Sequence, residues 1–139
     1  MASSCNKNND DDTPTKGKLK VNFEHYIDGN PIIYDSLMYV NEAGNRYLLY
    51  EVQYFVTDMV LYKSDGTSKT INDWTDYHYV DSNIPNSLTW DVYDELEPGT
   101  YDSIAFHLGF SSDKNESFMF VNSPEKDMIW PEYLGGGYH

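Results

Sequence analysis

The sequence predicts an all-β domain, built as an antiparallel β-sandwich or a partly open barrel. Tyr, Phe and Trp make up 16% of the 139 residues, and aromatic side chains suit the pleated, half-buried surface of a sheet. The strong helix former alanine is scarce. Short apolar runs are separated by turn signals at intervals of roughly eight to twelve residues, which is typical of sandwiches and barrels.

The first strand is predicted over residues 19–25. Its apolar residues Leu19, Val21 and Phe23 alternate with polar ones, which is the two-residue period of a half-buried strand. His25 falls in phase with this apolar set. The sequence Asp-Gly-Asn-Pro at residues 28–31 then ends the strand.

Two short apolar runs follow at residues 32–34 and 37–40, and a turn is predicted over residues 41–45. The run from 47 to 62 is too long for one flat strand. We therefore expect two strands that meet at a bend at Asp58, and the apolar spacing of this run also fits a helix.

The rest of the domain is expected to contribute strands at residues 77–80, 87–92 and 101–108. In the last of these, Ile104, Phe106 and Leu108 share one face. Residues 111–139 are expected to form a long loop with short helical turns. Because nothing in this loop would pair with the last strand, a sheet edge would stay open. We expect the sandwich to be incomplete at its C-terminus and the chain to be truncated at His139.

Residues 1–15 are predicted to lie outside the folded domain, which covers residues 16–139. Cys5 follows three small residues, Ala-Ser-Ser, and this resembles the end of a bacterial lipoprotein signal. The polar, acidic stretch behind it resembles the tether of surface lipoproteins from Bacteroidota. We expect Cys5 to carry the lipid, and the alternative is that this segment is the remnant of a tag.

The net charge of −14 argues against binding to nucleic acid, because phosphates are bound by lysine and arginine. Anionic membrane surfaces are disfavoured for the same reason. No segment is apolar and long enough to span a bilayer. Together with Cys5, this predicts an outer-membrane lipoprotein that faces the periplasm or the cell surface and touches the membrane only through its lipid.

Two of the four histidines are predicted to be metal ligands. His25 and His78 each share a strand face with apolar residues, where an unpaired imidazole costs about 1–3 kcal/mol. Two such imidazoles that meet across a sandwich would satisfy each other through a metal, and neutral imidazole suits copper and zinc. His107 lies opposite the apolar face of its strand, and we expect it to face solvent or a neighbouring ring. Nearby acids are expected to accept hydrogen bonds from the second ring nitrogens, namely Glu24, Asp76 and Asp81.

Enzyme motifs are absent from the sequence. It contains no Gly-x-Ser-x-Gly, no phosphate-binding glycine-rich loop and no His-Glu-x-x-His. Glu132 could pair with another carboxylate for glycoside hydrolysis, but among 23 acidic residues such a pair is expected by chance. We predict that the protein is not an enzyme.

Five segments, taken in order, resemble the MbnP-like copper-binding domain family, and the resemblance covers about residues 18–139. The segments are residues 19–31, 54–66, 77–81, 98–109 and 127–138. The resemblance implies a secreted or surface β-sandwich that holds one copper ion, as Cu(I) or Cu(II). In described relatives, the site consists of two histidines and a tryptophan oxidised to kynurenine by a protein similar to di-haem cytochrome c peroxidases.

Carried over by position, the family's ligands become His25, His78 and Trp130. The sequence departs from the family pattern directly after Trp130, where residues 131–137 replace a second tryptophan. His139 could then supply a third imidazole, and Trp130 could be a core anchor only. The resulting prediction is a lipid-anchored copper-binding protein that captures, buffers or delivers the metal. The alternative is a glycan- or protein-binding surface module without metal, in which exposed Tyr and Trp form a stacking platform.

Overall fold

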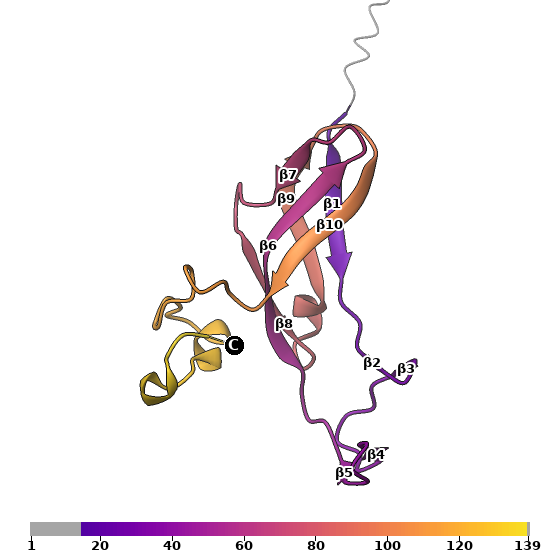
Figure 1. The fold of residues 1–139 in the computed structure, drawn as a ribbon, viewed down its shortest axis with the longest axis vertical. Helices are drawn as coiled ribbons and strands as arrows, with labels where there is room; N and C mark the ends of the chain where they lie inside the picture. The colour runs from indigo at the N-terminus through magenta and orange to yellow at the C-terminus, as the bar shows by residue number, and fades with distance from the viewer. Residues whose placement is uncertain (1–14, 139) are drawn as a thin grey trace, which may run out of the picture.

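The computed structural model describes residues 15–138, and its strands form two packed antiparallel layers (Figure 1). The first layer is the pair β1 (Gly17–Asn22) and β9 (Thr89–Leu96). The second layer is built on β6 (Gln53–Lys63). Its partners are β10 (Tyr101–Leu108) along one edge, and β7 (Ser68–Thr70) and β8 (Tyr77–Asp81) along the other. The predicted all-β sandwich is confirmed, and the described strands do not close into a barrel.

The main core lies between the two layers. Each layer contributes alternate residues of its strands, as the two-residue period requires. The buried members are Val56, Met59, Leu61, Ile71, Val80, Trp90, Val92 and Leu96. Half-buried Phe23, Tyr54 and Leu88 extend this core toward the end of the sandwich where β1 finishes.

The bend predicted at Asp58 is a β-bulge inside one continuous strand. Asp58 has φ +53°, and the pairing of β6 with β10 shifts register between Ala105 and His107. The extra residue lets Val56 and Met59, three positions apart, both face the core. The prediction of a break in direction is confirmed, while the predictions of two separate strands and of a helix are wrong.

The outer face of β6 and β8 is covered by residues 110–138. The fully buried Phe55 stacks on Phe120 with ring centroids 5.3 Å apart, and Tyr138 packs edge-on against both rings. This segment contains the short 3-10 helices η2 (Glu125–Met128) and η3 (Glu132–Leu134) and one isolated β-bridge between Ile129 and Tyr138, besides loops and turns. The predicted long loop with helical turns is therefore confirmed, and it forms a second apolar cluster.

Residues 26–47 form a small lobe of two-residue strand pairs that extends beyond the sandwich (Figure 1). The pairs are β2 (Tyr26–Ile27) with β3 (Asn30–Pro31), and β4 (Tyr39–Val40) with β5 (Arg46–Tyr47). The apolar run at residues 32–34 forms no strand, and the segment predicted as a strand at 87–92 begins as the 3-10 helix η1 (Pro85–Leu88).

The strand β10 pairs with β6 along one edge and with no described strand along the other. Its side chains Ile104, Phe106 and Leu108 are exposed. This matches the open sheet edge predicted from the sequence. Among residues 15–138, no helix has the length and the apolar composition needed to cross a membrane.

The bulge residue Asp58 also ties the C-terminal segment to the sheet. Its carboxylate accepts hydrogen bonds from Lys114 and from Nδ1 of His107, and Lys114 also binds Asp76 at 2.7 Å. The bonds from Lys114 and His107 hold the pKa of Asp58 below its usual value. Stability from this lowered pKa is present above the unfolded-state pKa, about 4, and is lost as the pH falls through the lower folded-state pKa.

We therefore expect Asp58→Asn to lose part of the acid dependence of folding. Asparagine tolerates the left-handed backbone at this position, so the variant isolates the charge. In urea unfolding between pH 2.5 and 7, the wild-type protein should be the more stable at pH 7, and the difference should shrink below about pH 4. Parallel stability curves for the two proteins would contradict this role of Asp58.

Candidate metal centre

His78 sits between the two layers of the sandwich, near the end of the main core. It faces Val56 of β6 in the strand register. Its imidazole is stacked between two aromatic rings, with centroid distances of 5.6 Å to Phe23 and 5.2 Å to Trp90 and interplanar angles of 11° and 6°. Burial lowers the pKa of His78 below its usual value, so the ring is neutral at pH 7.

One ring nitrogen of His78 is fixed by the backbone. Nε2 lies 2.7 Å from the carbonyl oxygen of Ser87, and a carbonyl can only accept a hydrogen bond. Nε2 therefore carries the proton, and Nδ1 keeps its lone pair. This arrangement, with one nitrogen held by an oxygen acceptor and the other available, is the one found in metal-bound histidines.

His25 lies just beyond the end of β1, and its ring is half-buried. Its Nε2 is 3.1 Å from the hydroxyl of Tyr54, and the two rings meet edge-on at a centroid distance of 5.7 Å. The same Tyr54 ring contacts Phe23 at 6.2 Å. His25 thus has one nitrogen engaged by a phenol and one nitrogen left for a further partner.

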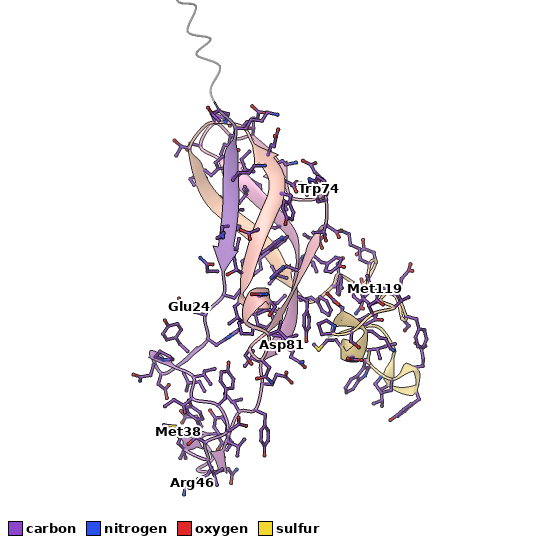
Figure 2. The ribbon with its side chains drawn as sticks, turned by 180° about the vertical axis from the view of Figure 1, so that it is seen from behind. Glu24, Met38, Arg46, Trp74, Asp81 and Met119 are labelled. Atoms are coloured by element: carbon purple, nitrogen blue, oxygen red, sulfur yellow. The ribbon has the colours of Figure 1, made fainter. Side chains whose placement is uncertain are left out.

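The two histidines belong to one aromatic cluster at one end of the sandwich. The rings follow one another in the order His25, Tyr54, Phe23, His78 and Trp90. Glu24, next to His25, and Asp81, at the end of β8, mark this end in Figure 2. Among the described residues, the two imidazoles have no ring neighbour in common and make no hydrogen bond to each other, because the rings of Tyr54 and Phe23 stand between them in this series.

A buried phenol without a partner lies beside His25. Tyr34 lines the same hollow of about 250 Å³ as His25. Its hydroxyl is the one buried side-chain oxygen or nitrogen without a hydrogen bond in the described part of the chain. The pKa of Tyr54 is raised, mainly by burial and to a smaller extent by the electrostatic effect of Tyr34. An unsatisfied buried hydroxyl costs about 1–3 kcal/mol, so Tyr34 is suited to a ligand that completes its bonding.

The acids expected to support the histidines bind other groups. Glu24 accepts from the hydroxyl of Tyr26, Asp76 binds Lys114, and Asp81 accepts from Tyr79 at 2.9 Å. The prediction that these carboxylates hold the histidines is wrong. The Tyr54 hydroxyl is the partner of His25, and the Ser87 carbonyl is the partner of His78.

Trp130 lies in a different part of the molecule. Its indole N–H donates to the Leu134 carbonyl at 3.1 Å, and its backbone N–H donates to Gly137 at 2.8 Å. The helices η2 and η3 that flank it lie on one side of β8, whereas β2 and β3 lie on the other (Figure 1). The indole that stacks on His78 is Trp90. The assignment of Trp130 as a metal donor stays a prediction.

The remaining predicted residues are divided between the exposed surface and the chain ends. His107 is exposed, as predicted, and its partner is the carboxylate of Asp58 at 3.0 Å instead of a ring. Cys5 and His139 lie outside the described residues, so both assignments stay predictions. Within residues 15–138, no group of three or more His, Cys, Asp or Glu side chains could hold a metal ion. A metal there would rely on the two imidazoles and a donor of another type.

Three residues of this cluster were not singled out from the sequence. Tyr34 is the last residue of the apolar run 32–34. Tyr54 lies near the start of β6, and Trp90 points to the same side of β9 as Val92. Tyr54 and Trp90 share strand phases with core residues, a signal that could have marked them as inward-facing. Tyr34 follows no strand period, so its burial could not be inferred from the pattern.

The protein-family model described as MbnP matches residues 16–139. No curated protein and no solved structure matches the chain. The family match spans the sandwich, the cluster around His25 and His78, and the C-terminal segment.

Proposed function

Because the chain belongs to the MbnP family, we propose that it binds one copper ion through His25 and His78 outside the cytoplasm. Membership in this family supports a copper-related role. In this proposal the protein captures, buffers or delivers the ion and performs no turnover of its own.

The observation that carries this proposal is the burial of the two imidazoles and the hydrogen bonding of their ring nitrogens. Both are half-buried in one aromatic cluster, and each has one ring nitrogen engaged by an oxygen atom. Burial lowers the pKa of His78 and so favours the neutral ring that a metal ligand must have. Copper accepts neutral imidazole readily in either oxidation state.

Residues beside each histidine support the proposal. The Tyr34 hydroxyl lacks a partner and lines the hollow of His25, so we assign it as the third donor. The rings of Phe23 and Trp90 both stack on His78 and would shield its side of the ion from part of the solvent. Bound copper would supply an exchangeable metal for a recipient protein, and the chain's own residues would hold it and shield it.

The direct test is equilibrium dialysis of the protein with Cu(I) under reducing conditions and with Cu(II) in air. We expect one copper per chain in at least one oxidation state. Tyr34→Phe removes only the unpaired hydroxyl. Because a hydroxyl is a weaker copper donor than an imidazole, its loss should weaken binding by about tenfold, which is less than the loss of either histidine. A protein that retains no copper in either state would contradict the proposal.

Trp130 belongs to the proposal through the family resemblance. We propose that a partner similar to di-haem cytochrome c peroxidases oxidises it to kynurenine with dioxygen or hydrogen peroxide as the oxidant. The C2–C3 bond of the indole breaks as each of its carbons gains an oxygen atom, and hydrolysis of the resulting formamide releases C2 as formate. The indole is exposed, which supports access for such a partner. Intact-mass measurement after co-expression with the partner should show the net loss of one carbon and gain of one oxygen in the wild-type protein and no change in Trp130→Phe. An unmodified wild-type protein would remove this part of the proposal.

We also propose that Cys5 carries a lipid that anchors the protein to the outer membrane, facing the periplasm or the cell surface. The support is the sequence around Cys5 alone. Wild-type protein in a bacterial host should enter the detergent phase of a Triton X-114 separation, and Cys5→Ala should remain in the aqueous phase. Equal partition of the two proteins would contradict the anchor.

A further inference from the structure

We propose that the groove beside β9 is a binding site for a neutral oligosaccharide, centred on the rings of Trp74 and Tyr93. Trp74 follows β7 in a loop, and Tyr93 stands on the outer face of β9. Their ring centroids are 5.9 Å apart with an interplanar angle of 55°. Figure 2 shows Trp74 beside the sandwich, away from the C-terminal segment that carries Met119.

The two rings are unusually exposed for their size. Trp74 is 77% exposed and Tyr93 is 65% exposed. Single apolar side chains on a surface need no explanation, but large neighbouring rings that line one hollow mark a contact site. The hollow here measures about 600 Å³, within the range of small-molecule sites.

The loop that carries Trp74 is held in place by a buried carboxylate. Asp94 is only 2% exposed. It accepts hydrogen bonds from the backbone N–H groups of Asn72 and Asp73 at 3.0 and 3.1 Å, and it pairs with Lys69 at 3.0 Å. These bonds fix the backbone directly before Trp74. A site held in this way loses little conformational entropy when a ligand binds.

The charges around the groove favour a neutral ligand. Besides the two rings, the groove is lined by three lysines and three carboxylates, which sum to zero on a chain of net charge −14. The lining charges are Lys16, Lys18, Lys69, Asp73, Glu95 and Glu97. Several already pair with each other, as Lys16 does with Glu95 at 2.9 Å and Lys69 does with Asp73 at 2.8 Å. Ammonium and carboxylate groups donate to and accept from hydroxyls, while aromatic faces pack on the C–H faces of sugar rings.

A protein partner fits this groove less well. Protein interfaces of ordinary strength cover about 800 Å² on each partner, and charged residues are depleted at their centre. In this groove six charged side chains surround the two rings. The arrangement therefore favours a small polyhydroxylated ligand.

The test is a titration of the full chain with neutral hexasaccharides of the glucan, xylan and mannan types. A chelator is present throughout, and Trp fluorescence and heat of binding are followed. At least one series should bind, and Trp74→Ala and Tyr93→Ala should each weaken binding by at least roughly tenfold. Trp74→Phe should retain most of the affinity.

Matched controls separate this site from the copper site and from general surface changes. Tyr50 is also exposed and is not among the residues that line the groove, so Tyr50→Ala should bind sugar normally. His25→Ala should do the same, and it is preferred to a change at His78 because Trp74 and His78 also line one smaller hollow together. Absence of binding to every neutral series, binding that Trp74→Ala leaves unchanged, or a protein partner held by Trp74 in place of a sugar would each overturn the proposal.

Discussion

Replacing either His25 or His78 is expected to weaken copper binding by roughly 100-fold or more. Each change removes one of two imidazoles, and loss of a ligand should exceed the 10- to 100-fold cost of losing a group that only supports a ligand. The affinity is measured by competition with chromophoric chelators of Cu(I) and of Cu(II). For His25, the variant to be measured is His25→Ala.

For His78, the variant must preserve the stacking of aromatic rings around this position. His78 fills the space between Phe23 and Trp90, so alanine would leave a cavity. His78→Phe preserves a flat ring there and removes both nitrogens. His107→Ala is the matched control, because His107 is an exposed histidine outside the cluster and its loss should leave the affinity unchanged. Copper affinity that survives both His25→Ala and His78→Phe would refute the assignment of the ligands.

Phe55→Ala is expected to lower the free energy of unfolding by about 3–5 kcal/mol, the usual cost of removing a large buried ring. Phe55 is fully buried and contacts five other rings of the second cluster. These are Tyr77, Tyr79, Phe110, Phe120 and Tyr138. The loss should therefore loosen the C-terminal segment from the sheet as well as destabilise the whole domain.

Urea unfolding followed by circular dichroism measures this effect. The control is Tyr133→Ala, which truncates an aromatic ring of the same segment that is mostly exposed and should cost less than about 0.5 kcal/mol. Amide hydrogen exchange of residues 110–138 reports the loosening directly. If Phe55→Ala cost no more than Tyr133→Ala, the second cluster would not be the support of this segment.

The strands that sequence analysis located best are β10, predicted with its observed bounds, and β8, predicted one residue short. β1 and β9 were recognised by their alternation, which runs between half-buried and exposed positions in β1 and between buried and exposed positions in β9, but their ends differ from the predicted ones by two to four residues. The continuity of β6 through Asp58 was not predictable in the same way. A bulge keeps two strands in register with one extra residue, so its position depends on the partner β10 as much as on β6 itself.

The candidate site was predictable only in part. His25 and His78 stand in phase with apolar neighbours, and this phase alone marks them as candidate ligands. Their surroundings depend on pairings between distant segments. Trp90 of β9 reaches His78 of β8 because the two layers of the sandwich pack together, and Tyr54 reaches His25 across 29 positions of the chain. Local periodicity carries no information about such pairings.

The most direct test of shared copper binding is NMR of the protein with 15N-labelled histidine rings during titration with Cu(I), which is diamagnetic. We predict that the ring signals of His25 and His78 shift together and reach their end points at one equivalent of copper, while those of His107 stay unchanged. A shift of only one of the two, or separate end points for them, would show that the two imidazoles do not hold the same ion.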